Sequence, residues 1–202
     1  IIYSEISKRI TDKTSDKLAH YLRLKSDGIM ITVKTLNIDN PKLNCRLEGF
    51  NQFSPKRIIL DRNLQIDLKS YIAKSIKNKN TIIFHNSNDK SKIKLLKKRG
   101  TTLIKQSTDK YKNLDLKKIL KDLYKMEIRN LLVEGGDILT KNFIQKKLFN
   151  EFYVFRSSKN LSKNKKHVNF TSFSILNTKY NKHKINSKLA TDKLTIYKNW
   201  NV

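Results

Sequence analysis

Apolar residues occur along this chain in short runs and in spaced sets, and the two patterns alternate. Short runs rich in Ile, Leu, Val and Phe are typical of buried β-strands. Such runs occupy Ile29–Val33, Arg57–Leu60, Thr81–Phe84, Thr102–Ile104, Leu131–Val133, Glu151–Phe155 and Lys193–Lys198. Before and between them, apolar residues three or four positions apart predict helices over residues 12–26, 89–98, 114–126 and 137–146.

The alternation of strands with helices predicts an α/β fold with a mostly parallel sheet. Lys34–Phe53 holds Pro41, Gly49 and several Asn, so it is predicted to be an ordered loop with little regular structure. Arg156–Lys188 is polar, rich in Lys, Asn and Ser, and has no clear period. Neither an internal repeat nor a heptad pattern is present, and 202 residues fit one domain or at most two small ones.

Composition limits the settings in which the protein works. The apolar runs are far shorter than the ~20 residues of a membrane-spanning helix, and the chain opens without a secretory signal pattern. The single cysteine, Cys45, excludes an internal disulfide and a cysteine-based zinc site. We therefore expect a cytoplasmic protein that binds neither a metal nor a membrane.

The formal net charge of +27 is the most unusual property of the composition. It suggests a nucleic-acid partner, because basic patches neutralise phosphates. However, only eight of the 44 basic residues are Arg, whereas bidentate recognition of phosphates and bases favours Arg. The lysines are also spread along the whole chain. We therefore predict a lysine-rich surface that attracts anionic ligands, and no specific nucleic-acid site.

The segment Leu131–Leu139 combines a short strand, a carboxylate, a glycine pair and the start of a helix. Two of the five glycines of the chain, Gly135 and Gly136, are adjacent here. Glycine lets the backbone approach a bulky anion and adopt a positive φ, and the N–H groups that open a helix favour phosphate. Glu134 would lie at the carboxyl end of the strand, where open α/β sheets bind ligands. The alternative is a tight strand–helix turn without a ligand.

Several short motifs follow one another along the chain. They are Ile10-Thr11, His20-Tyr21-Leu22-Arg23, Ser26-Asp27, Thr35–Arg46, Pro55–Asp61, Leu132–Gly136 and Asn150–Tyr153. In this order and at these spacings they resemble the reductase domain of bacterial riboflavin biosynthesis, usually the C-terminal half of a bifunctional deaminase/reductase. Thr35–Arg46 is similar to its T-V-L-x-D-x-P-x-L-x-x-R loop, and Leu132–Gly136 is similar to its L-V-E-G-G turn. The resemblance implies a dihydrofolate-reductase-like three-layer sandwich with a mostly parallel central sheet.

The resemblance also implies an activity: NADPH-dependent reduction of 5-amino-6-(5-phosphoribosylamino)uracil to its ribitylamino product. A hydride would go to C1′ of the ring-opened ribose, which is a Schiff-base carbon. The residue types agree, because the four His are scattered without a Ser-His-Asp order, and hydride transfer needs no protein nucleophile. The implied partner is a phosphorylated ribosylamino-pyrimidine, and members of the family are often homodimers.

Roles for individual residues follow from the same resemblance. Substrate contacts are implied for Ser7, Arg23, Asp39, Leu43, Arg46 and Glu134. Arg23 and Arg46 would hold the substrate phosphate, which suits the planar guanidinium, while Asp39 and Glu134 would be the catalytic residues. Cofactor contacts are implied for Thr35, Gly135, Gly136, Asp137, Ile138, Leu139 and Thr140. Taken alone, Arg23 could simply close a helix, and Asp39-Asn40-Pro41 could be only a turn.

The chain also departs from the family pattern. It shows no opening A-x-S-x-D-G strand, it has Arg9 where the family usually has Trp, and a glycine that often follows the position of Leu161 is missing. We therefore expect the first strand of the family to be missing, and no deamination, because the deaminase zinc motif is absent from this sequence. The alternatives are a pyrimidinone or pterin reductase of the same fold, a lysine-rich nucleic-acid-binding domain, or an inactive remnant.

Overall fold

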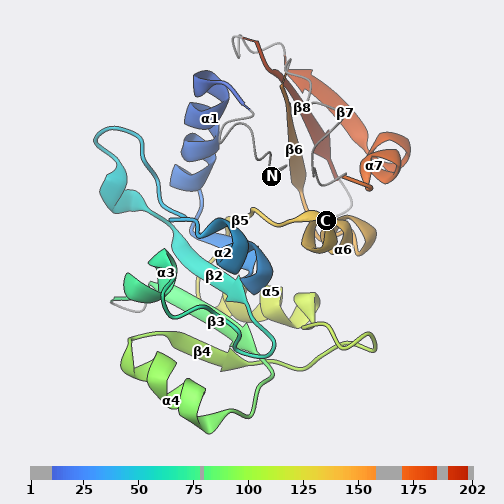
Figure 1. The fold of residues 1–202 in the computed structure, drawn as a ribbon. Coiled ribbons are helices and arrows are strands. Elements are labelled where there is room, and N and C mark those ends of the chain that lie inside the picture. The colour runs from blue at the N-terminus through green and yellow to red at the C-terminus, as the bar shows by residue number, and fades with distance from the viewer. Residues whose placement is uncertain (1–10, 78–79, 158–169, 186–190, 200–202) are drawn as a thin grey trace, which may run out of the picture. The chain divides into compact units, whose positions relative to one another are not determined.

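The computed structural model describes residues 11–77, 80–157, 170–185 and 191–199 (Figure 1). The chain divides into two compact units. Unit 1 contains the residues up to Ala19 and those from Gly136 onward, and unit 2 runs from His20 to Gly135. Helix α1 (Lys13–Leu24) contributes its first half to unit 1 and its second half to unit 2. One reductase domain spanning the whole chain stays a prediction.

Unit 2 is built on a five-stranded parallel sheet with the order β4-β3-β2-β1-β5 (Figure 1). Its strands are β1 (Gly28–Thr32), β2 (Lys56–Leu60), β3 (Thr81–His85), β4 (Thr102–Lys105) and β5 (Leu131–Val133). The connecting helices are α2 (Val33–Asp39), α3 (Tyr71–Lys74), α4 (Lys90–Lys98) and α5 (Leu116–Lys125). The predicted α/β fold with a parallel central sheet is confirmed.

Apolar side chains alternate between the two faces of this sheet. One face packs against α2, α3 and α4 in a buried cluster that includes Ile29, Ile31, Leu36, Ile59, Ile72, Ile83 and Leu96. Met30, Ile58 and Phe84 lie at the alternate positions of their strands and are fully buried as well. The chain returns through α5 from β4 to the far side of β1, and the right-handed crossover rule assigns α5 to this second face. Unit 2 therefore has three layers, helix on sheet on helix.

The predicted loop Lys34–Phe53 is partly wrong, because its first residues belong to helix α2. The hydroxyl of Thr32 accepts a hydrogen bond from the N–H of Thr35 at 3.3 Å and caps the start of the helix. Asn40 ends it in the left-handed conformation, with φ of 43°. Leu36 is fully buried, but a helix of seven residues has only about two turns. So short a helix leaves too little apolar periodicity to detect.

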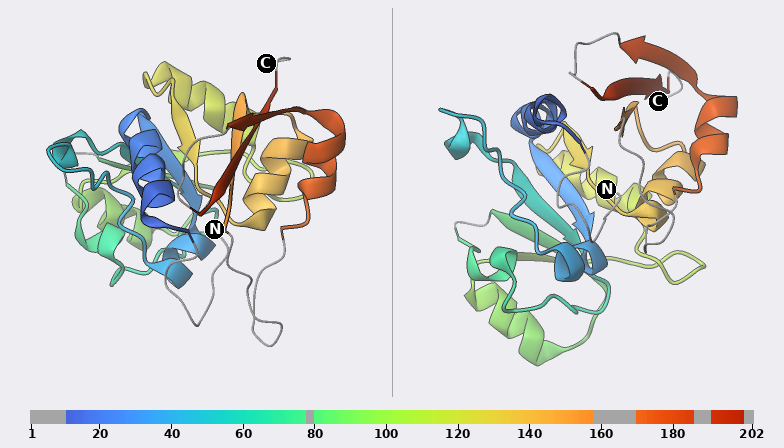
Figure 2. Two further views of the ribbon diagram at one scale, coloured as in Figure 1. Left: turned by 90° about the horizontal axis from the view of Figure 1, so that it is seen from above. Right: turned by 45° about the horizontal axis from the view of Figure 1, so that its top comes forward.

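Unit 1 contains a three-stranded antiparallel sheet with the order β6-β8-β7 (Figure 2). Its strands are β6 (Glu151–Arg156), β7 (Asn181–Ile185) and β8 (Lys193–Lys198), and its helices besides α1 are α6 (Asp137–Gln145) and α7 (Phe173–Lys179). Ile144, Leu176 and Tyr197 join α6, α7 and β8 in one core. The sequence pattern did not predict α7, β7, α3 or the 3-10 turn Asn51–Phe53. In α7 the reason is that only Leu176 is buried, which gives a weak helical signal.

Candidate functional site

The reversal of strand order beside β1 marks the place where a ligand site is expected in unit 2. From β1 the chain adds β2, β3 and β4 in one direction, and β5 then pairs with the other side of β1. Open α/β sheets bind ligands at such a reversal, at the carboxyl ends of the strands. Glu134 directly follows β5, and its N–H donates to the carbonyl oxygen of Met30 in β1 at 3.0 Å. The backbone thus fixes Glu134 at the reversal.

A bidentate ion pair joins Glu134 to Arg23 in the last turn of α1. Arg23 Nε lies 2.7 Å from Glu134 Oε1, and Arg23 Nη2 lies 2.8 Å from Glu134 Oε2. The two side chains are only 14% and 15% exposed. The third nitrogen, Nη1, donates to the carbonyl oxygen of Asn44 at 3.2 Å. The guanidinium fork that the resemblance assigns to a phosphate is therefore engaged with Glu134, and Arg23 orients that carboxylate.

The loop Leu43–Arg46 alternates between buried and exposed side chains. Leu43 and Cys45 are buried, whereas Arg46 is exposed. Leu43 has a φ of 50° and its side chain lies in the core, so any substrate contact of Leu43 would come from its backbone. The buried Oδ1 of Asn44 accepts no hydrogen bond in the described part of the chain. A hydroxyl or N–H of a ligand could satisfy this acceptor.

Two contacts hold the same loop to His20 of α1. The backbone N–H of Arg46 donates to His20 Nδ1 at 3.2 Å, and Cys45 Sγ donates to the carbonyl oxygen of His20 at 3.7 Å. The guanidinium of Arg46 forms no hydrogen bond or ion pair within the described ranges of the structure. Arg46 is therefore the arginine of this region whose fork is available to an anion.

Two other predicted site residues lie on α2, which begins at the carboxyl end of β1. Thr35 is in the first turn, with its hydroxyl 3.2 Å from that of Thr32. Asp39 is the last residue of the helix and is exposed. Desolvation by neighbouring groups raises the pKa of the Asp39 carboxyl above its ordinary value of 3.8. Within the described residues, Arg23 donates to Glu134 and Asn44 and not to the carboxylate of Asp39, so Asp39 is not part of the ion pair.

The predicted phosphate cradle at the start of α6 has a backbone that differs from expectation. Gly136 is the N-cap of α6 with φ of −68°, and neither Gly135 nor Gly136 has a positive φ. The predicted use of glycine for positive φ is therefore wrong at both positions. What glycine supplies is the absence of a side chain, because α6 has no side-chain N-cap. By contrast, side chains cap α2, α3, α4 and α5 at Thr32, Ser70, Asp89 and Asp115.

The next residues of α6 offer their backbone rather than their side chains. The carboxylate of Asp137 accepts hydrogen bonds from the N–H and the hydroxyl of Thr171, both at 3.2 Å. Leu139 is buried and Ile138 is 68% exposed, while the N–H of Thr140 donates to the carbonyl oxygen of Gly136. A phosphate here would meet backbone N–H groups, as the sequence interpretation requires.

The structure thus brings Arg23 and Glu134 together with Asn44. Ser7 lies outside the described residues. Sequence reasoning missed Asn44 and the contacts of His20 with the loop, although two signals were available. These are the alternation of apolar and polar residues over Leu43–Arg46, and the spacing of three between His20 and Arg23 on one helix face. No group of three or more His, Cys, Asp or Glu side chains in the described residues could hold a metal ion.

Comparison with known families decides which domain this is. The family model described as the RibD C-terminal domain matches residues 3–187. The chain belongs to this family. This RibD C-terminal domain is 33% identical over 153 residues to the riboflavin biosynthesis protein RibD of Aquifex aeolicus, covering 76% of this chain and 41% of that protein. It is 28% identical over 143 residues to the 2,5-diamino-6-ribosylamino-4(3H)-pyrimidinone 5′-phosphate reductase of the same organism, covering 70% and 61%.

Solved structures share the fold of the RibD C-terminal domain. Acinetobacter baumannii RibD matches with a TM-score of 0.74 at 20% identity, over 97% of this chain and 53% of that one. The riboflavin biosynthesis reductase Rib7 of Saccharomyces matches with a TM-score of 0.71 at 21% identity, over 93% and 81%. The chain spans 41% and 61% of the two Aquifex proteins. None of the helices in the described ranges is long and apolar enough to cross a membrane.

Proposed function

We propose that this domain reduces 5-amino-6-(5-phosphoribosylamino)uracil to 5-amino-6-(5-phosphoribitylamino)uracil, with NADPH as the hydride donor. Relatives named as RibD and as a pyrimidinone 5′-phosphate reductase support a reductase that acts on a phosphorylated ribosylamino-pyrimidine. The observation that carries the proposal is the Arg23–Glu134 pair, held at the strand reversal beside the loop that exposes Arg46. The site thus joins an oriented carboxylate with an available guanidinium.

On the substrate side, Arg46 holds the phosphate, because its fork is exposed and pairs bidentately with phosphate oxygens. Glu134 contacts the ribose or its Schiff-base form, oriented by Arg23 so that both carboxylate oxygens have fixed positions. Asn44 Oδ1 accepts from a substrate hydroxyl or N–H, which satisfies its buried lone pairs. Asp39 is an acid or base near the substrate, and its raised pKa extends its protonated range upward from 3.8.

The first turn of α6 fits the diphosphate of a nicotinamide dinucleotide. Its N-cap glycine has no side chain that could cap the first N–H groups, and the helix dipole favours negative charge there. The carboxylate of Asp137 is already paired with Thr171. A cofactor contact of Thr35 stays a prediction of the family resemblance. NADPH supplies the hydride when bound, and the chain binds and orients both molecules.

A second candidate substrate has its own support. Several relatives are named 2,5-diamino-6-ribosylamino-4(3H)-pyrimidinone 5′-phosphate reductases, so their names give a diamino-pyrimidinone as the substrate. Arg46 and Glu134 would contact phosphate and ribose, which both substrates share. The pyrimidine base preferred by this chain therefore has to be measured directly.

The test is consumption of NADPH, followed by its absorbance, with each of the two phosphoribosylamino-pyrimidines. We expect turnover of the aminouracil, a lower kcat/KM for the diamino-pyrimidinone, and a lower kcat/KM with NADH. Glu134→Gln should lose most turnover, whereas Lys94→Gln, an exposed change on α4, should keep it. NADPH consumption with neither substrate would refute the proposed function. Equal loss in both variants would refute the role of Glu134.

A further inference from the structure

We propose that His20 is a positioning residue: it fixes the backbone of the loop that carries Arg46 and thereby tightens binding of the substrate phosphate. The contact is the hydrogen bond from the Arg46 N–H to His20 Nδ1, 3.2 Å long. His20 does not touch the phosphate in this scheme. The inference rests on the proposed function, since that function gives Arg46 its ligand.

Buried apolar side chains and two polar contacts anchor the loop up to Cys45, one of them from Arg23 Nη1 to the carbonyl oxygen of Asn44 at 3.2 Å. Leu43 and Cys45 are 2% and 0% exposed, so their side chains are held in the core of unit 2. Cys45 is buried and the next residue, Arg46, is exposed, so the side chain of Arg46 lies on the outer side. The N–H of Cys45 also donates to the hydroxyl of Ser54 at 3.1 Å. At the next residue, the contact with His20 holds the backbone N–H of Arg46 itself.

The chemistry of His20 suits this role. A nitrogen that accepts a hydrogen bond must carry a lone pair, so the contact assigns the proton of a neutral His20 to Nε2. The carbonyl oxygen of His20 accepts from Cys45 Sγ at 3.7 Å, which gives the same residue a second, weaker hold on the loop. Two successive residues of the loop are thus attached to one residue of α1.

Helix α1 couples this attachment to the Glu134 side of the site. His20 and Arg23 are three residues apart and lie on one helix face. Arg23 binds the carbonyl oxygen of Asn44 and both oxygens of Glu134. One turn of α1 therefore sets the positions of both Arg46, which would bind the phosphate, and the carboxylate of Glu134. Loss of His20 should loosen the loop at Arg46, while the contacts of Arg23 with Asn44 and Glu134 remain.

The experiment compares His20→Leu, which removes the acceptor, with His20→Asn, whose Oδ1 can replace Nδ1. The probe is ribose 5-phosphate, titrated into the ¹⁵N-labelled protein and followed by NMR. We expect His20→Leu to weaken its binding roughly 3- to 10-fold, the range of one neutral hydrogen bond, and His20→Asn to restore most of the affinity. The amide of Arg46 should exchange with solvent faster in His20→Leu by a similar factor. Tyr21→Leu, an exposed change beside His20, is the control and should match wild type.

A double-mutant cycle separates positioning from general loss of structure. In an Arg46→Ala background, His20→Leu should not weaken ribose 5-phosphate binding further, because the guanidinium that His20 positions is gone. With the phosphoribosylamino-uracil, His20→Leu should raise KM by the same factor and leave kcat unchanged. A dephosphorylated substrate should not distinguish the variants. Additive effects in the cycle would overturn the inference.

The two proposals fail in different ways. If wild type reduces the substrate but His20→Leu binds ribose 5-phosphate as tightly, His20 has no positioning role and the proposed function stands. If wild type consumes no NADPH but the ribose 5-phosphate results are as expected, the reductase assignment fails and the role of His20 stands. Absence of ribose 5-phosphate binding by wild type overturns the role of His20.

Discussion

Individual residues of the same type differ sharply in what their surroundings allow. The family resemblance predicts that Arg23 and Arg46 both bind the substrate phosphate. In the structure, however, Arg23 is 14% exposed and paired with Glu134, while Arg46 is exposed. A guanidinium with an occupied fork orients its partner, and an unoccupied fork binds an anion. The two arginines therefore contribute to the site in different ways, which separate measurements can resolve.

Arg46→Lys tests phosphate recognition at the residue scale. Lysine keeps the charge but loses the planar fork, so KM for the phosphorylated substrate should rise by an amount equivalent to about 1.5–3 kcal/mol, the range of a hydrogen bond to a charged group. Steady-state kinetics measure the change, with a dephosphorylated substrate as the control. If wild type and Arg46→Lys use the dephosphorylated substrate and the phosphorylated one equally well, Arg46 does not bind the phosphate.

Arg23→Gln tests the ion pair with Glu134. It leaves a carboxylate that is 15% exposed without its cation, so the free energy of unfolding should fall by about 3 kcal/mol, the lower end of the range for a broken buried pair. Urea unfolding measures the loss. The double variant Arg23→Gln/Glu134→Gln should recover part of it, because the unpaired charge is removed. A double variant as unstable as the sum of the two single ones would contradict this account.

Among the helices, α6 differs from those of unit 2 in how it begins. Side chains cap α2, α3, α4 and α5, whereas α6 starts at Gly136 without one. Compared with glycine at the same position, a side-chain cap adds only about a few tenths of a kcal/mol, so α6 loses little by leaving its first N–H groups for a ligand.

Gly136→Val tests cofactor binding at this element. Gly136 has φ of −68° and ψ of 176°, which valine also adopts, so the fold should persist. The added methyl groups would occupy the space that a phosphate needs beside the first turn. NADPH affinity, measured by fluorescence, should be lost while circular dichroism and the melting temperature stay near those of wild type. Unchanged NADPH affinity would remove the start of α6 from the cofactor site.

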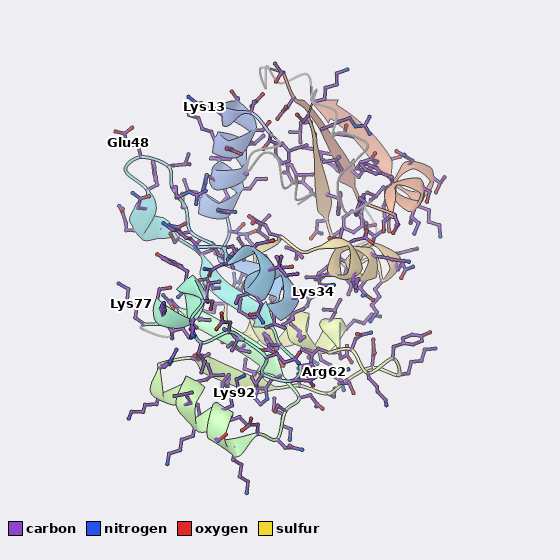
Figure 3. The ribbon with its side chains drawn as sticks, viewed as in Figure 1. Lys13, Lys34, Glu48, Arg62, Lys77 and Lys92 are labelled. Atoms are coloured by element: carbon purple, nitrogen blue, oxygen red, sulfur yellow. The ribbon has the colours of Figure 1, made fainter. Side chains whose placement is uncertain are left out.

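At the scale of the whole molecule, charge and buried titratable groups set the response to solution conditions. Lys34, Lys77 and Lys92 of unit 2 come from three different segments (Figure 3), and Lys34 and Lys77 are exposed. The positive charge is therefore distributed over the surface of that unit rather than gathered on one element. In the interior, Asp61 and His85 follow or end neighbouring strands β2 and β3 and are 0% and 3% exposed.

Salt dependence tests the meaning of the charge of +27. A lysine-rich surface without a stacking platform should bind random RNA and DNA weakly at low ionic strength and release them steeply by physiological salt. A salt titration with one RNA and one DNA of equal length measures this. Tight, sequence-preferring binding at physiological salt would favour a nucleic-acid-binding domain instead. The rate at which the protein encounters its phosphorylated substrate, measured as kcat/KM, should decline less steeply over the same salt titration.

The pH dependence of stability tests the buried His85. Burial lowers the pKa of His85 below its ordinary value of 6.5, so the unfolded chain takes up a proton at higher pH than the folded one. The contribution of neutral His85 to the free energy of unfolding is therefore present above pH 6.5 and is lost as the pH falls through the pKa of the folded state. Urea unfolding between pH 7.5 and about 5 should therefore show a slope in wild type that His85→Asn reduces.

Asp61 provides the internal check on that prediction. Burial raises the pKa of the Asp61 carboxyl above 3.8, so its contribution has the opposite sign: it is present at low pH and lost as the pH rises through the folded pKa. Both proteins keep Asp61, so the difference between the wild-type and His85→Asn slopes reports mainly on His85. An unchanged slope would mean that His85 titrates alike in the folded and unfolded states.

Local pattern determined the five strands of the parallel sheet, α4, α5 and α6, and the position of Glu134 at a strand end, because each depends on a period or a turn within a few residues. It also determined the order of motifs that resembles the reductase family. Elements with one buried side chain, such as α7 with Leu176, escaped detection because so few buried positions define no period.

Only the tertiary structure decided which groups meet. Arg23 and Glu134 are far apart in sequence, and nothing local shows that a guanidinium on α1 faces a carboxylate after β5. The return of β5 beside β1 creates that contact, and it leaves Arg46 as the available arginine. The contact of His20 with the Arg46 N–H arises in the same way. Periodicity encodes how each segment folds, whereas partner choice across the sheet depends on topology, which acts over the whole chain.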